Sequence, residues 1–146
     1  MLTSDYLEII DLLKTHNVEF VIVGAYAMGA FGYVRATGDI DILINPRLDN
    51  TKKLIKALTA FGAPLDSVSS EDFTKPEVVF QIGIAPVRID ILTSIDGVSF
   101  ADIQPEQHDI GGVTAPVIDL KNLLLNKQST GRLRDLADCE ELKKRI

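Results

Sequence analysis

The chain has 146 residues, of which 46% are hydrophobic and 25% charged, and its formal net charge is −6. This profile is typical of one folded domain, and it excludes a disordered chain and long-range attraction of the whole molecule to nucleic acid or anionic lipid. The single cysteine, Cys139, excludes a disulfide framework. No apolar run reaches the ~20 residues of a membrane span and no signal-peptide pattern is present, so we expect a cytoplasmic protein without membrane contact.

The first half of the chain predicts alternating helices and strands. Apolar residues recur at helical spacing after Thr3 or Ser4, either of which can cap a helix. The β-branched run 20–23 ends at Gly24, which suits a buried strand that turns sharply into a helix. In chain order we expect a helix up to about Asn17, strand 20–23, helix 26–31, loop 32–38, strand 39–44, and a helix capped by Asp49 or Asn50 and ended by Gly62.

The second half predicts a hairpin followed by less regular segments. Two strand-like runs, 78–84 and 87–93, flank Ala85-Pro86, which is the spacing of an antiparallel hairpin. Weaker strand patterns surround the turn at Gly111-Gly112. The remaining expectations are a loop over 63–76 with a helical turn near 71–73, strands over 98–103 and 113–118, a helix after Asp119, and a last helix from about Arg132.

Three aspartates lie within otherwise apolar strand patterns. Side chains alternate along a strand, so Asp39 and Asp41 share one face, about 6 to 7 Å apart at Cα, and isoleucines take the other. Asp90 repeats the pattern in VRIDIL on a later strand. Like charges this close favour a divalent cation, and hard oxygen ligands suit magnesium. Three carboxylates on adjacent strands are typical of two-metal phosphoryl-transfer sites, whereas a solvated sheet face is the alternative.

Gly24 is a second candidate feature, at the expected turn from strand to helix. Glycine at such a turn allows backbone amides to approach an anion, and the start of the following helix favours phosphate. Phosphate near Gly24 and metal near Asp39 and Asp41 would meet on one nucleoside triphosphate. Simple close packing at the turn is the alternative explanation of this glycine.

Three segments together resemble a known family: VGAYAMGAFGYVRATGDIDILI, RIDILTSIDGV and LKNLLLNKQSTGRLRDLADCEEL. The chain is similar, over residues 5–142, to the DNA polymerase β-like nucleotidyltransferase superfamily, and within it to small prokaryotic proteins related to AbiEii-type toxins. This resemblance implies an α/β (α+β) fold in a single domain, 1–146. The fold would be a minimal nucleotidyltransferase core, with a mixed twisted sheet and helices packed mainly on one side.

The resemblance also implies an activity and its partners. The family moves a nucleoside monophosphate from a nucleoside triphosphate to an acceptor hydroxyl, with Mg²⁺ or Mn²⁺ as cofactor. The acceptor would be a protein or an RNA. A role in a toxin–antitoxin or phage-defence system is implied by the toxin branch, with an antitoxin as partner. A homodimer is left open.

Site residues follow from the matching positions. Asp39 and Asp41 would hold both metals, and Asp90 would join one metal and orient or deprotonate the acceptor. The triphosphate would lie on Gly24 and Ala25 and on the loop residues Arg35 and Thr37. Lys127, Arg132, Arg134 and Asp135 match a lysine and an RxKD-like element of the toxin branch, with arginine in place of its lysine. A solvated charged helix face is the alternative for this element.

Ala25 departs from the family pattern. The superfamily usually has serine or glycine at this position, and the serine hydroxyl contacts a triphosphate oxygen. Losing one hydrogen bond to a charged group costs about 1.5 to 3 kcal/mol. A catalytically weak or silent nucleotide-binding or partner-binding module therefore stays open beside the enzyme. For Arg35 the alternative to a nucleotide contact is a salt bridge that anchors its loop.

Overall fold

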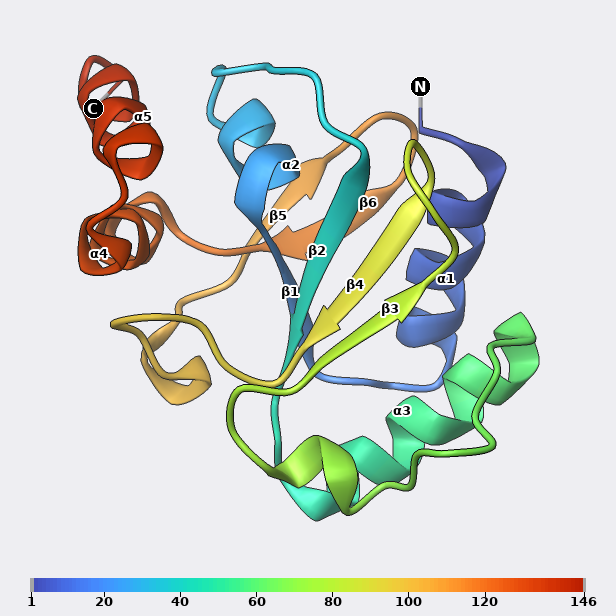
Figure 1. Cartoon of the computed structure of the whole chain (residues 1–146). Coiled ribbons are helices and arrows are strands. Elements are labelled where there is room, and N and C mark those ends of the chain that lie inside the picture. Colours follow the sequence, from blue (N-terminus) through green and yellow to red (C-terminus); the bar gives the residue numbers. More distant parts are fainter. Residues whose placement is uncertain (1, 146) are drawn as a thin grey trace.

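A central six-stranded sheet with five α-helices around it makes up the described part of the chain, residues 2–145 of a computed structural model (Figure 1). Helices and strands alternate over residues 4–61, as the apolar periodicities predict, and four strands and then two α-helices follow. The helices are α1 (Ser4–Thr15), α2 (Gly24–Ala30), α3 (Leu48–Phe61), α4 (Leu120–Thr130) and α5 (Leu133–Lys143). The strands are β1 (Phe20–Val23), β2 (Asp39–Ile44), β3 (Val79–Ile82), β4 (Arg88–Leu92), β5 (Glu106–Asp109) and β6 (Thr114–Val117).

The sheet is mixed, and its strand order is β3-β4-β2-β1-β6-β5. β2 lies inside it, antiparallel to β1 and parallel to β4. The pair β3–β4 is antiparallel, which confirms the predicted hairpin, and β5–β6 is antiparallel as well. The parallel contact of β1 with β6 completes the sheet. This architecture confirms the α/β class with a mixed sheet.

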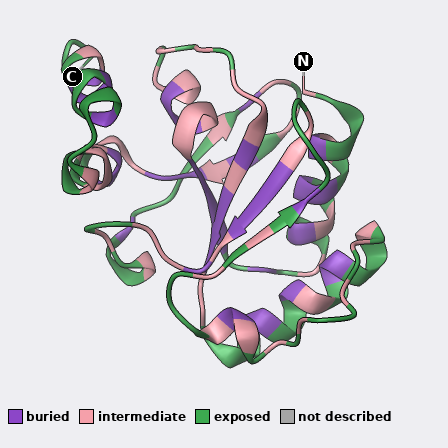
Figure 2. Ribbon diagram, in the orientation of Figure 1, coloured by how far each residue is buried: buried purple, intermediate pink, exposed green. Residues whose placement is uncertain are grey.

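The core lies on the isoleucine side of the central strands. Ile40, Ile42 and Ile44 of β2 are fully buried, whereas Asp39 and Asp41, which alternate with them, are only partly buried. Figure 2 accordingly shows β2 in bands of intermediate and buried residues, and β1 beside it is buried throughout. Helices α1 and α3 pack against each other, and Figure 1 shows the pair α4–α5 on the opposite side of the molecule from them. The polar side of β2 is therefore left to form a cleft.

The second half of the chain corrects one predicted strand. Residues 98–103 form no strand; a 3₁₀ turn, Phe100–Asp102, occupies them, and the partner of β6 is β5, EQHD. Three of the four side chains of β5 are exposed, because this strand lies at the edge of the sheet. An edge strand of this kind carries no apolar alternation that a sequence pattern could detect.

The start of α3 also differs from the expectation. Arg47 is the residue before the helix, so neither Asp49 nor Asn50 caps it. Asn50 is buried within the first turn, where its side chain accepts a hydrogen bond from the Glu19 backbone N–H (2.7 Å) and donates to the Asn45 carbonyl (2.8 Å). A buried amide must be satisfied, and here it ties α3 to the segments beside β1 and β2. α4, in contrast, begins after Asp119 as predicted, and the Asp119 side chain caps it by accepting a hydrogen bond from the Asn122 backbone N–H.

Two smaller findings concern the other helices. α2 begins directly at Gly24, so strand and helix meet without the separate turn expected before residue 26. The short helical turn predicted near 71–73 is present as Asp72–Thr74. Among the residues described, no helix combines the length and the apolar content that crossing a membrane requires.

Candidate active site

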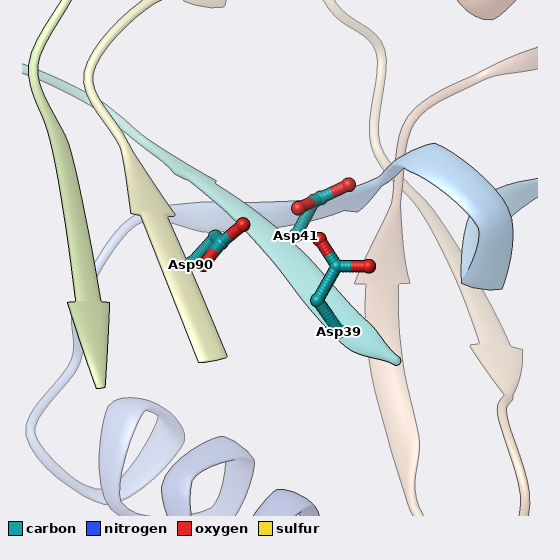
Figure 3. Close-up of side chains that lie close together, drawn as sticks. All are labelled: Asp39, Asp41 and Asp90. Carbon is teal, nitrogen blue, oxygen red and sulfur yellow. The ribbon is translucent and has the colours of Figure 1, made fainter. Parts of the chain in front are cut away.

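Three carboxylates converge on the polar side of the sheet. β2 and β4 pair in parallel with Asp41 opposite Asp90, so alternation places both side chains, and that of Asp39, on the same face. One oxygen atom from each carboxylate lies within 4.8 Å of the other two. Figure 3 shows the three side chains pointing toward one another from the two neighbouring strands. The convergence predicted from DID and RIDIL is thus present.

Arg88 on β4 also belongs to this cluster. Its Nη2 donates to Asp39 Oδ2 (3.1 Å) and to Asp90 Oδ2 (3.2 Å), and its Nε donates to Asp90 Oδ1 (3.0 Å). Thr37 adds a hydrogen bond to the other oxygen of Asp39, Oδ1 (2.8 Å). Both oxygens of Asp39 and of Asp90 therefore accept a hydrogen bond, which fixes their orientation.

The electrostatics of the three carboxyl groups differ. Burial, and after it the charges of Asp39 and Asp90, raise the pKa of Asp41 to about 7. Burial likewise raises the pKa of Asp90, although Arg88 opposes the shift. For Asp39 burial is outweighed by hydrogen bonds, led by that from Thr37, and its pKa is lowered. The cluster thus favours a proton or a cation at Asp41.

These residues fit a divalent cation. The donors are carboxylate oxygens from three side chains, the set that magnesium and manganese prefer, and no thiolate or imidazole is among them. A partly buried carboxylate whose negative charge is not neutralised attracts a proton or a metal ion. The surroundings that raise the pKa of Asp41 therefore also favour the binding of a cation.

Gly24 stands directly against Asp41. The backbone of Gly24 has φ +69°, and a Cβ at this position would overlap the Asp41 oxygen Oδ2. Gly24 is therefore closely packed, as the alternative explanation predicts. It packs against a carboxylate of the cluster and not against the apolar core. The first turn of α2 is held at the edge of the site by this contact.

A cleft of about 480 Å³ lies beside the cluster, and its two walls differ in charge. The wall from the sheet has the carboxylates of Asp39 and Asp41 and the guanidinium of Arg88, and Ala25 and Thr37 also line the cleft. The facing residues come from the α4–α5 pair. They are Lys127, Arg132, Arg134 and Asp135, which we call the basic wall. Such a bipolar cleft can take a ligand with cations at one end and anionic groups at the other.

Buried carboxylates hold the basic wall in place. Lys127 Nζ lies 3.0 Å from Asp135 Oδ1 and 3.2 Å from Asp138 Oδ2. Arg132 Nε contacts Asp135 Oδ2 at 2.7 Å, and Thr130 donates to the same oxygen. Burial would raise the pKa of Asp135, but these hydrogen bonds lower it to about 2. Lys127 and Asp135 are thus fixed in a buried ion-pair network, whereas Arg132 and Arg134 are exposed, as a solvated helix face would have them.

Arg35 is placed away from the carboxylate cluster. Its Nη1 lies 2.6 Å from Asp138 Oδ1, so the loop before β2 is tied to α5 by an ion pair, as the loop-anchoring alternative predicts. Arg145 adds a second tie, since it donates to the Gly32 carbonyl and stacks over the Tyr33 ring. The C-terminal helix therefore holds the loop that leads into Asp39.

Sequence reasoning missed two charged residues of this region. Arg88 stands two residues before Asp90, and the alternation in R-I-D-I-L could have placed it on the carboxylate face. Asp138 pairs with both Arg35 and Lys127 from 103 and 11 residues away. Nothing local in the sequence signals that contact, because it depends on the packing of α5 against the loop 32–38.

No protein-family model and no curated protein sequence matches the chain significantly. Solved structures do match. The lincosamide antibiotic adenylyltransferase LnuA, bound to lincomycin, aligns with a TM-score of 0.64 over 100% of this chain and 99% of its own, at 16% identity. The antibiotic-resistance factor ANT(2'')-Ia aligns with a TM-score of 0.66 over 97% of this chain and 82% of its own, at 14% identity.

A third match is a protein from Thermotoga maritima that carries a provisional nucleotidyltransferase assignment. It aligns with a TM-score of 0.63 over 99% of this chain and 94% of its own, at 18% identity. At these identities the likeness shows the fold. The chain therefore has a nucleotidyltransferase-type fold, and its carboxylate cluster lies on the central strands of that fold.

Proposed function

We propose that this protein is a metal-dependent nucleotidyltransferase. It moves a nucleoside monophosphate from a nucleoside triphosphate to an acceptor hydroxyl and releases pyrophosphate. The observation that carries the proposal is the convergence of Asp39, Asp41 and Asp90 on one face of two parallel strands, beside a cleft with a basic wall. The fold shared with known nucleotidyltransferases supports it.

The carboxylates hold Mg²⁺ or Mn²⁺ in this proposal. Bound there, such ions stabilise the charge that develops on the attacking and leaving oxygens of a phosphoryl transfer. Asp39 and Asp41 are the main ligands, and Asp90 also orients the acceptor hydroxyl. Thr37 contributes by fixing one oxygen of Asp39. Arg35 contacts the nucleotide only if its guanidinium leaves Asp138, with which it is paired.

The triphosphate lies between Gly24 and the basic wall. Gly24 and Ala25 bring backbone to the cleft beside Asp41, and Lys127, Arg132 and Arg134 offer positive charge across from them. Arg132 is largely exposed and paired with Asp135 alone, whereas Lys127 is mostly buried and fixed by two carboxylates. Lys127 therefore acts as a preorganised charge, and the arginines adapt to the ligand.

The acceptor hydroxyl belongs to a protein, an RNA or a small molecule. The net charge of −6 favours a protein or a small acceptor over RNA. LnuA is described as a lincosamide antibiotic adenylyltransferase, and ANT(2'')-Ia has been seen with adenylyl-2"-tobramycin, so small hydroxylated acceptors are included. Under the toxin hypothesis the protein also binds an antitoxin. We place it in the cytoplasm, where nucleoside triphosphates are found, and a homodimer is an option.

Label transfer tests the proposed function. The protein is incubated with α-³²P-labelled ATP, CTP, GTP or UTP, with Mg²⁺ or Mn²⁺, and with cell extract, total RNA or a panel of hydroxylated antibiotics. We expect metal-dependent labelling of one acceptor class, lost in the double variant Asp39→Asn, Asp41→Asn. The variant Asp11→Asn, at an exposed position on α1, is the matched control. Equal labelling by the double variant would refute the proposal.

A silent binding module of the same fold is the second candidate. Ala25, which lacks a hydroxyl for the triphosphate, is the observation that favours it. This candidate predicts that a nucleoside triphosphate binds in the presence of metal, and that no label is transferred under any condition. The variant Ala25→Ser then separates the two, because an enzyme weakened at this position gains transfer and a module does not.

A further inference from the structure

Arg88 is a cation among the three carboxylates. Its guanidinium makes three hydrogen bonds of 3.0 to 3.2 Å, one to Asp39 and two to Asp90. A planar guanidinium that bridges two carboxylates fixes their separation, as a shared metal ion would. Asp39 on β2 and Asp90 on β4 are therefore already joined by a positive charge across the two strands.

Asp41 accepts no hydrogen bond from Arg88. In the described part of the chain no side chain donates a hydrogen bond to it, and its Oδ2 occupies the space that a Cβ at Gly24 would need. Asp41 lines the cleft, as Asp39 does. Asp41 is thus the carboxylate of the cluster that lines the cleft without a hydrogen bond from Arg88.

Asp90 is shielded from the cleft. It is 5% exposed and does not line the cleft, whereas the Arg88 side chain bonded to it is 34% exposed and does. An ion that is to reach Asp90 must move Arg88 aside. The formal charges agree with this view, because three carboxylates and one guanidinium leave −2, which a single divalent cation balances.

We propose that Arg88 takes the place of one divalent cation in the nucleotide-free protein. The free site then binds one Mg²⁺ or Mn²⁺ tightly, and a second ion enters only when the phosphates of a nucleotide add negative charge beside Arg88. Arg88 is in this sense a positioning residue that sets the number of ions. The inference rests on the proposed function, since it concerns the same carboxylates.

Counting bound Mn²⁺ without nucleotide tests the inference. Free Mn²⁺ is followed by electron paramagnetic resonance during titration of wild type, Arg88→Gln and Arg88→Lys. We expect one tightly bound ion per chain in wild type and two in Arg88→Gln. The dissociation constant of the second ion should be at least about tenfold lower in Arg88→Gln than in wild type, because a nearby positive charge is gone. Arg88→Lys keeps the positive charge but lacks the planar guanidinium that bridges two carboxylates. Its second ion should bind with an affinity between those of wild type and Arg88→Gln.

The control is Arg47→Gln, which removes an exposed arginine paired with Asp49 far from the cleft and should leave the count at one. Two tightly bound ions in wild type, or one ion in both wild type and Arg88→Gln, overturn the inference. Label transfer by wild type alongside either of those counts leaves the proposed function intact. Transfer that survives Asp39→Asn, Asp41→Asn instead removes the proposed function, whatever the Mn²⁺ count.

Discussion

Gly24 lies so close to Asp41 that a β-carbon at position 24 would overlap the carboxylate oxygen Oδ2. Two separate constraints therefore act on this position. Its φ of +69° is in the left-handed region, where a side chain costs about 1 to 2 kcal/mol, and the space a side chain would need is taken by Asp41. The glycine thus couples the start of α2 to the orientation of a candidate metal ligand.

Gly24→Ala should harm transfer much more than stability. The displaced Asp41 would leave its place in the carboxylate cluster, and a misplacement of about 1 Å at a reacting centre can cost about 10²-fold in rate. We expect a loss of that order in label transfer and of about 1 to 2 kcal/mol in the free energy of unfolding. Urea denaturation and initial transfer rates measure the two effects.

Gly62→Ala is the control for backbone strain alone. Gly62 ends α3 at φ +90°, and a Cβ there would meet no atom within 4 Å. This variant should lose about 1 kcal/mol of stability and keep wild-type transfer. If both glycine variants lost transfer equally, contact with Asp41 would not be the cause.

Asp41→Asn should stabilise the metal-free protein at pH 8. The pKa of Asp41 is raised to about 7 in the folded state, so the folded protein holds this proton more tightly than the unfolded chain does. Its stability then falls as the pH rises from about 4 to 7, at about 1.4 kcal/mol per unit of pKa shift. A neutral Asn avoids that cost, so the gain should be a few kcal/mol at pH 8 and vanish near pH 4.

Urea denaturation in EDTA at pH 4, 6 and 8 measures this gain, with Asp11→Asn as the matched control. Added Mg²⁺ should reduce the difference in unfolding free energy between Asp41→Asn and wild type at pH 8. The cation stabilises ionised Asp41 in wild type and has no such partner in the variant. A wild type more stable than Asp41→Asn at pH 8 in EDTA would contradict the prediction.

Asp135→Asn should have the opposite pH dependence. Hydrogen bonds from Thr130, Lys127 and Arg132 outweigh burial and lower the pKa of Asp135 to about 2, below its ordinary value. The stability that this carboxylate contributes is therefore present above pH 4 and lost as the pH falls toward 2. We expect the variant to lose about 2 kcal/mol at pH 7 and little near pH 2. Guanidinium-chloride unfolding at both pH values checks this.

Arg35→Gln should loosen the loop 32–38. The variant breaks the 2.6 Å ion pair with the buried Asp138 and leaves the Arg145 contact to Gly32 in place. We expect faster amide hydrogen exchange at residues 33–39, with exchange in β1 unchanged. The KM for the nucleoside triphosphate should stay near that of wild type if Arg35 only anchors the loop, and rise if it contacts the nucleotide.

The sequence predicted the carboxylate side of the site well, because its determinants are local. Strand alternation alone puts Asp39 and Asp41 on one face, and the repeated pattern at Asp90 needs only neighbouring strands to converge. Arg88 was within reach of the same reasoning, since it shares the face of Asp90.

The basic wall and the loop anchors were less predictable. The ion pairs of Asp138 join Arg35 and Lys127, which lie on different elements, and they exist only because α5 packs beside the loop 32–38. β5 escaped detection for a different reason: its exposed EQHD sequence is held in the sheet by backbone hydrogen bonds to β6, which side-chain periodicity does not report.

The parallel pairing of β2 with β4 makes the carboxylate cluster a late product of folding. Asp41 and Asp90 become neighbours only after the intervening crossover, with α3 and β3, has formed and returned the chain in the same direction. Closing a loop of that length costs entropy before any contact repays it. A chain emerging from the ribosome can therefore hold no complete carboxylate cluster until β4 has been made, so the proposed transfer would have no site in a half-synthesised chain.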